Sequence, residues 1–308
     1  MLDFIKKTFS EFSEDRCTTL GASLAFYTIF SLPPLLFILV TIVSWGLSMT
    51  QSGDAEQRAQ EVIQQQASGM LGNESASSMI QTILENRKND EASWWKTAIS
   101  IVGILVGATG VVAAIQDSLN RVWEVKPDPK TGGGWWSIVV KRLLSLSMIL
   151  GLGFILLVSL LLTAVFTSVG DKMLGAVGIS AGVGQAVNYV MQFVIIVVVF
   201  GALFRFMPDA IIRWRDVLVG ALVTAILFMV GQFVLHWYLS SSDPGDQLGS
   251  AAGSLAVVLI WVYYSSLIFL FGAEVTQVYA QKYGDGVQPE PHAVHFEETI
   301  KRRGDATA

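Results

Sequence analysis

TAISIVGILVGATGVVAAIQDSLNRVWE, residues 97–124, is the stretch that decides the fold. Its first twenty residues, Thr97–Gln116, carry no charge. At about 1.5 Å per helical residue, a helix of this length crosses a hydrocarbon core of about 30 Å. The stretch therefore predicts a membrane-spanning helix with a polar end near Glu124.

Small residues recur along this helix in steps of three and four, which places them on one face. They are Gly103, Gly107, Gly110 and Ala114, and polar side chains follow at Asp117, Asn120 and Arg121. Small residues let a neighbouring helix approach closely within lipid, whereas charges at the membrane border are costly unless they have partners. We interpret the small residues as a helix-packing face. The polar group is either functional or an ordinary end to the helix.

The composition extends this prediction to the whole chain. Of its 308 residues, 52% are hydrophobic and 15% are charged, whereas a soluble domain carries about 25% charge. Because backbone groups in lipid must be hydrogen-bonded within their own segment, long charge-free runs favour helices. We therefore predict an all-α fold, a polytopic membrane bundle of six transmembrane helices. The charge-free runs are 17–53, 97–116, 143–170, 173–204, 217–242 and 247–273.

The remaining segments divide the chain into three parts. Apolar residues recur at helical spacing between Leu2 and Phe12, which predicts a short amphipathic helix on the membrane surface. This N-terminal segment lacks the apolar core of a cleavable signal, so the first span is expected to direct insertion. The predicted parts are the interfacial helix at 1–16, the transmembrane domain at 17–280 with an outer insertion of short amphipathic helices at 50–94, and a mobile cytoplasmic tail at 281–308.

The distribution of Lys and Arg predicts the orientation. Fifteen of the twenty lie before the first span, in the connections after the second and fourth spans, or after the sixth span. The other five lie in the opposite connections. By the positive-inside rule, both termini are cytoplasmic.

Two adjacent prolines, Pro33 and Pro34, lie about halfway along the first apolar run. They remove two backbone donors, which predicts a kink or a break in the helix. Ser23, Tyr27 and Ser31 share one face that leads to this point. Broken helices build binding sites in transporters, but prolines also kink purely structural spans. Both interpretations stay open.

Further polar side chains lie in the later spans. They are Gln185, Asn188 and Gln192 on one face of the fourth span, and Gln232 and His236 one turn apart in the fifth. Buried amides either bond across helices or line a wet cavity. We treat these residues as candidates for the lining of a polar cavity.

Glu274 lies about one turn from the cytoplasmic end of the sixth span and needs a partner. Arginines predicted at the same membrane face are the candidates, namely Arg16, Arg121, Arg142 and Arg205. No catalytic residue, metal site or cofactor is predicted, because no His, Cys, Asp or Glu cluster has the spacing of metal ligands.

Five motifs occur in one order along the chain, and together they resemble a known family. They are ASLAFYTIFSLPPLL (22–36), GATGVVAAIQDSLNRVWEV (107–125), RFMPDAIIRWRDVLVGALV (205–223), WYLS (237–240) and GSLAVVLIWVYYSSLIFLFGAEVTQVYA (253–280). The family is YihY/virulence factor BrkB, bacterial inner-membrane proteins long called ribonuclease BN. The resemblance covers residues 10–283. It implies six spans, a bacterial inner-membrane location, links to envelope integrity, and movement of lipids or small molecules without an agreed substrate.

Two functions follow from these observations. The first is a membrane protein that moves or binds a lipid, or another amphiphilic or small molecule, through a polar cavity in the bundle. The alternative is a scaffold for envelope integrity that transports nothing. Membrane lipids are the expected partners. A net charge of -5 offers no general attraction to nucleic acid, so neither a nucleic-acid partner nor ribonuclease activity is expected.

Overall fold

The computed structural model describes residues 2–31, 110–128, 181–241 and 250–296. Within these ranges, the side chains of 181–188, 239–241 and 250–255 are left out. The Pro33-Pro34 pair, the outer insertion at 50–94 and the third predicted span lie outside the described residues.

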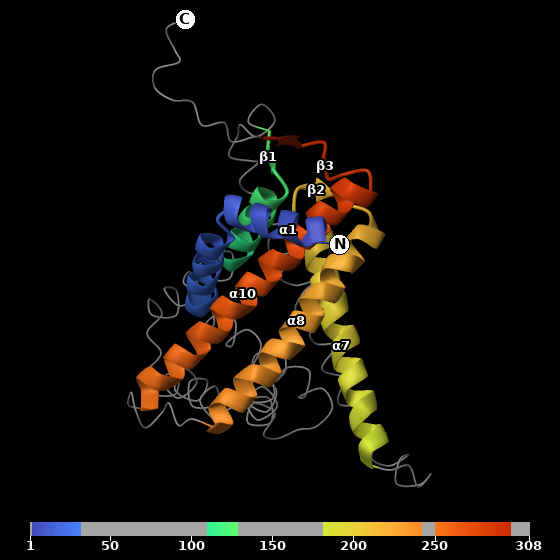
Figure 1. Cartoon of the computed structure of the whole chain (residues 1–308). Helices are drawn as coiled ribbons and strands as arrows, with labels where there is room; N and C mark the ends of the chain where they lie inside the picture. Colours follow the sequence, from blue (N-terminus) through green and yellow to red (C-terminus); the bar gives the residue numbers. More distant parts are fainter. Residues whose placement is uncertain (1, 32–109, 129–180, 242–249, 297–308) are drawn as a thin grey trace, which may run out of the picture.

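The chain begins with two helices joined by a tight turn. Helix α1, Leu2–Glu14, is followed by the turn residues Asp15 and Arg16 and then by the helix Cys17–Ser31. α1 lies across one end of the bundle and contacts α10 (Figure 1). The ring of Phe9 lies 5.2 Å from that of Phe271 on α10, measured between centroids. The predicted amphipathic pattern thus becomes a helix whose aromatic side packs on the bundle.

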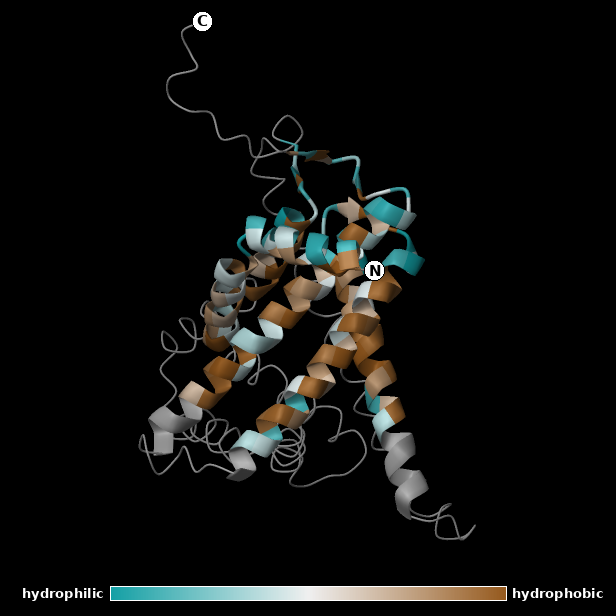
Figure 2. Ribbon diagram, in the orientation of Figure 1, coloured by the Kyte–Doolittle hydropathy of each residue, from teal (hydrophilic) through white to brown (hydrophobic). Residues whose placement is uncertain are grey.

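Three long helices form most of the described structure. They are α7 (Ala181–Phe206), α8 (Trp214–Ser241) and α10 (Ser250–Tyr283). α8 packs against both α7 and α10, and the three run side by side (Figure 1). Each contains a segment long and apolar enough to cross a membrane, and the middle of each is strongly hydrophobic (Figure 2). The fold is therefore mostly helical, with three membrane-span candidates among the described residues.

Reciprocal contacts between glycine and threonine bring α8 and α10 close together. A Cβ added at Gly220 would collide with the side chain of Thr276, and one added at Gly272 would collide with Thr224. Each threonine hydroxyl donates to the glycine carbonyl four residues earlier on its own helix, at 2.8 Å for Thr224 and 2.9 Å for Thr276. The same Gly-x-x-x-Thr pattern on two antiparallel helices thus forms one interlock, as small residues do in membrane bundles.

We call the end of the bundle that α1 crosses the polar end. It comprises α1, residues 116–128, the α7–α8 connection and residues 284–296. The hydrophobic core lies toward this end of the bundle. Trp123 packs edge-on against Phe204, which stacks on Phe269 at 5.3 Å between centroids. The indole Nε1 of Trp123 donates to the Ala273 carbonyl at 3.2 Å. These contacts fasten the end of helix 110–122 to α7 and α10.

Four short strands, which the sequence analysis did not predict, close the polar end. β1 (Val125–Pro127) pairs antiparallel with β4 (Ala293–His295), and β2 (Ala210–Ile211) pairs antiparallel with β3 (Gln288–Pro289). The strands lie together above the helix ends (Figure 1). α10 continues to Tyr283, beyond the predicted boundary at 280. β3 and β4 therefore form inside the segment that was predicted as a mobile tail from residue 281.

Candidate functional site at the polar end

Asp209, in the α7–α8 connection, is the centre of a hydrogen-bond network. Asn120 Nδ2 donates to its Oδ2 at 2.8 Å, and the Asp209 amide donates back to Asn120 Oδ1 at 2.8 Å. Its Oδ1 also accepts from Gln116 Nε2 at 3.1 Å and lies 3.1 Å from His292 Nε2. The Glu290 amide donates to the Asp209 carbonyl at 3.0 Å. One carboxylate thus joins helix 110–122, the α7–α8 connection and the strand-forming tail.

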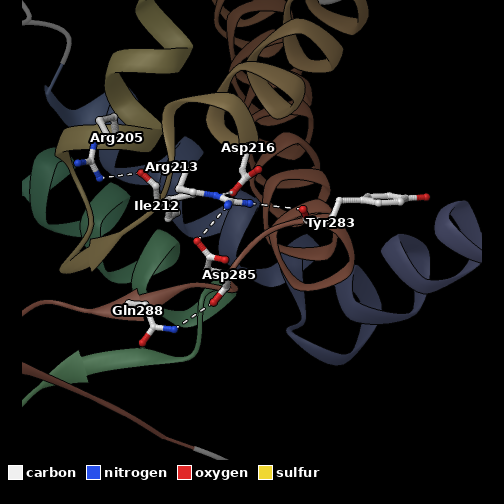
Figure 3. A network of polar contacts seen from close by, with 7 residues as sticks. All are labelled: Arg205, Ile212, Arg213, Asp216, Tyr283, Asp285 and Gln288. Atoms are coloured by element: carbon white, nitrogen blue, oxygen red, sulfur yellow. Dashed lines mark hydrogen bonds and ion pairs between the residues drawn. The ribbon is translucent and has the colours of Figure 1, made fainter.

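Arg213, at the start of α8, forms a second network (Figure 3). Its Nε donates to Asp216 at 3.2 Å and its Nη1 donates to Asp285 at 2.9 Å. These groups border a hollow of about 350 Å³ that is lined by Arg213, Arg215, Asp216, Tyr279 and Tyr283. Because two carboxylates balance the Arg213 guanidinium, this network works as a clamp between α8 and the end of α10.

Glu274 is fully buried within the span candidate of α10. Its Oε1 accepts a hydrogen bond from the Cys17 thiol, with 3.3 Å between the sulfur and the oxygen. Its Oε2 is also buried and has no hydrogen-bond partner among the described residues. A carboxylate held by one weak donor is costly to bury, which makes Glu274 the most unusual ionisable group of the described bundle.

Asp15 extends this buried site toward the surface. Its carboxyl interacts with that of Glu274, while Arg121 supplies a nearby positive charge and Glu11 and Glu124 supply negative ones. Burial, together with repulsion from Glu124 and Glu11, raises the pKa of Asp15 to about 7, although Arg121 opposes the shift. Burial, followed by repulsion from Glu14, also raises the pKa of Glu11. The turn between the first two helices therefore holds an acid that titrates near neutral pH.

The sequence comparisons identify the family to which these features belong. A family model described as virulence factor BrkB matches residues 8–296, which is almost the whole chain. The chain belongs to the virulence factor BrkB family. This match confirms the resemblance drawn from the five motifs.

Curated relatives of this BrkB-family chain are named as membrane proteins or as a ribonuclease-like protein. The ribonuclease-like protein YfkH of Bacillus subtilis (strain 168) is 24% identical over 89% of this chain and 94% of its own length. A UPF0761 membrane protein of Aeromonas salmonicida (strain A449) is 26% identical over 89% of this chain and 87% of its own. A second, from Alkalilimnicola ehrlichii, is 26% identical over 91% of this chain but 58% of its own. No solved structure matches the chain.

The family, the relatives' names and the apolar helices together show that this is an integral membrane protein in contact with lipid. The ribonuclease-like name belongs to the Bacillus relative. Among the residues that the structure describes, no three His, Cys, Asp or Glu side chains lie close enough to hold a metal ion.

The BrkB-family structure brings some of the predicted site residues to the polar end. Asn120 is buried in the Asp209 network, Glu274 is buried beside Cys17, and Arg121 lies near Asp15. Asp117, on the same helix, is exposed. Glu274 contacts Cys17 and Asp15, which the sequence did not indicate as its partners. Of the proposed arginines, Arg16 is exposed, Arg205 donates to the Ile212 carbonyl at 2.8 Å, and Arg142 lies outside the described residues.

A second group of predicted site residues lies on α7 and α8, away from the polar end. Gln192 Nε2 on α7 donates to Gln232 Oε1 on α8 at 3.2 Å, so this pair bonds across helices. Gln232 lies about 27 Å along α8 from Trp214, given the helical rise. His236, one turn further, is exposed. Gln192, Gln232 and His236 thus lie apart from the predicted residues at the polar end.

The helix Cys17–Ser31 carries the predicted polar face, which is only partly exposed in the described structure. Ser23 and Tyr27 are exposed, whereas Ser31 is buried and its hydroxyl donates to the Thr28 carbonyl at 2.8 Å. A Cβ at Gly110 would lie 3.5 Å from the Tyr27 ring, and Ala114 packs against the core. Pro33, Pro34, Gly103 and Gly107 lie outside the described residues, as do the side chains of Gln185 and Asn188.

Four residues of the site were missed from the sequence. They are Asp15, Cys17, Asp209 and His292. A signal was available for Asp15 and Cys17, because they stand at the start of the first apolar run. The positive-inside topology places that end at the same membrane face as Asn120 and Glu274.

Proposed function

We propose that this chain is an inner-membrane protein with six transmembrane helices that moves or binds a lipid or another amphiphilic molecule. The observation that carries the proposal is Glu274, an acid buried within a span candidate whose second oxygen has no hydrogen-bond partner among the described residues. Ionisable groups inside a membrane are expensive and usually serve function. A bundle with a purely structural role gains no stability from a buried acid such as Glu274.

The orientation follows from the charge distribution. The polar end carries Lys7, Arg121, Arg213 and Lys282, and the positive-inside rule directs such an end to the cytoplasm. Both chain termini then lie in the cytoplasm. Glu274 is reached from that side through the turn at Asp15.

An amphiphile fits the described surfaces better than an inorganic ion. Ser23 and Tyr27 are exposed on the helix Cys17–Ser31, which also exposes the aromatic rings of Phe26 and Phe30. Polar groups set in an apolar surface match a molecule with a polar head and a hydrocarbon chain. The substrate class that we assign is therefore a lipid or a small amphiphile.

The test measures lipid movement in vesicles that contain the purified chain. A fluorescent phospholipid in the inner leaflet is expected to reach a membrane-impermeant quencher faster than it does in protein-free vesicles. Glu274→Gln should slow this movement, whereas Glu14→Gln, at an exposed position on α1, should leave it unchanged. Equal rates with and without protein, for both a phosphatidylglycerol and a phosphatidylethanolamine probe, would refute lipid movement.

The alternative is a scaffold, and one observation favours it. The Gly-Thr interlock of α8 and α10 and the strand pairs at the polar end hold these segments in one arrangement, as a platform for partners requires. A scaffold predicts no lipid movement and the retention of a defined envelope protein during purification. That retention should survive Glu274→Gln.

A further inference from the structure

The buried acid pair at the polar end points to a ligand for the proposed transport function. Glu274 Oε1 accepts from the Cys17 thiol, while the buried Oε2 has no partner among the described residues. The Asp15 carboxyl interacts with this group from the turn between α1 and the helix Cys17–Ser31. Two carboxyl groups that lie close together in a desolvated site do not both ionise readily. The simplest occupant of the open oxygen is a proton.

A route for that proton leads to the surface. Glu124 is exposed, Asp15 is half-buried and Glu274 is fully buried, so the carboxyl groups descend in steps from solvent into the bundle. The ionisable groups that face the pair are Glu11 from α1, Cys17 from the next helix, and Arg121 and Glu124 from the end of helix 110–122. Arg121 stabilises the ionised form of Asp15, which makes Asp15 a suitable intermediate acceptor.

We propose that Asp15 and Glu274 form a proton-binding site that couples proton uptake from the polar end to movement of the amphiphile. This inference rests on the proposed transport function. In the uptake step, a proton from solvent at the polar end forms an O–H bond on the ionised Asp15; this O–H bond then breaks as an O–H bond forms on Glu274, so that Asp15 is again the carboxylate beside Arg121. The pair then carries one negative charge instead of two.

The coupling has a structural basis in the turn that carries Asp15. This turn joins α1, which packs on α10, to the helix Cys17–Ser31, which contacts α10 through Cys17. Loss of the proton places two like charges together in a desolvated site and pushes the turn away from α10. Uptake of a proton removes that repulsion, so the protonation state biases the position of the first two helices relative to α10.

The chain supplies its own probe, because Cys17 is its single cysteine and donates directly to Glu274. Its S–H stretching band in the infrared therefore reports one hydrogen bond. A thiol bonds more strongly to a carboxylate than to a neutral carboxyl group, which lowers the S–H frequency. In the reconstituted protein, the band should move to lower frequency as the pH rises from about 5 to about 10 and the pair loses the proton held on Glu274.

Variants identify the titrating pair. Cys17→Ala should remove the band, Glu274→Gln should abolish its pH dependence, and Asp15→Asn should displace the midpoint. Asp3→Asn, at an exposed position in the first turn of α1, should change nothing. A wild-type band that stays constant over this pH range would overturn the proton site even if Glu274→Gln failed to fold. A shift that persists in folded Glu274→Gln would also overturn it.

The same measurements separate the two proposals. The infrared band needs no substrate, so a pH-dependent band without lipid movement leaves the proton site standing and rejects transport. Lipid movement that is independent of pH, together with a constant band, supports transport and rejects the proton site.

Discussion

Replacing Gly220 by alanine tests the close approach of α8 and α10. The added Cβ would lie 2.5 Å from the Gly272 carbonyl oxygen and 3.1 Å from the Thr276 Cβ, besides colliding with the threonine hydroxyl. A backbone carbonyl cannot turn aside as a side chain can. The helices must therefore separate by roughly 1 Å before these atoms reach ordinary contact distance.

The expected cost can be bounded. Overpacking of this kind costs about 1–3 kcal/mol, and the higher helix preference of alanine returns about 1 kcal/mol. We expect Gly220→Ala to lower the free energy of unfolding by up to about 2 kcal/mol. The matched control is Gly201→Ala, where the nearest atom is the Ala221 Cβ at 3.8 Å and the change should be neutral or stabilising.

Equilibrium unfolding of the purified variants in mixed detergent micelles, followed by tryptophan fluorescence, measures this difference. The two variants should differ by about 1–3 kcal/mol, with Gly220→Ala the less stable, because the helix preference of alanine contributes equally to both. If Gly220→Ala equals or exceeds Gly201→Ala in stability, the reciprocal interlock does not determine the packing of α8 on α10.

Three further predictions concern the polar contacts. Burial raises the Asp15 pKa from 3.8 to about 7, so the folded state binds its proton more tightly than the unfolded state and stability falls as pH rises between these values. Asp15→Asn should flatten this fall by about 2 kcal/mol after allowance for solvent screening, and an unchanged pH profile of unfolding would contradict it. Asn120→Ala removes both hydrogen bonds to Asp209 and should speed cleavage of the native protein by a glutamate-specific protease at Glu290; equal cleavage rates would show that the network does not hold the tail. A double-mutant cycle of Gln192→Leu and Gln232→Leu should give a coupling of about 0.6–1.7 kcal/mol, and additive effects would mean that the amides do not bond in the membrane.

The hydrophobic pattern along the chain made the helices predictable from the sequence. The apolar runs behind α7, α8 and α10 are long, and the hydrophobic spacing between Leu2 and Phe12 indicated α1 as an amphipathic helix. Such signals are local, because each helix satisfies its own backbone hydrogen bonds. The close packing of Gly220 on Thr276 was not identified, although the Gly-x-x-x-Thr spacing is visible on both helices. Recognising it required knowledge of which two helices are neighbours.

The polar contacts were predictable only in part. Asn120 and Glu274 were singled out because polar residues at the end of an apolar run are unusual. Their partners Asp209 and Cys17 lie 89 and 257 residues away along the chain, and nothing local indicates such pairings. The strands β3 and β4 were missed for a related reason, since two or three residues are too few to show an alternating pattern.

The strand pairs at the polar end set an order in which the molecule can be completed. Residues 288–295 leave the ribosome after every helix described here, yet they supply the partners of both β1 and β2. Until they emerge, two strand edges stay unpaired, and such edges invite wrong pairing and proteolysis. A nascent chain that stopped after Tyr283 would thus contain its hydrophobic helices, but β1 and β2 would lack their partner strands. Cellular surveillance can distinguish this state from the finished protein.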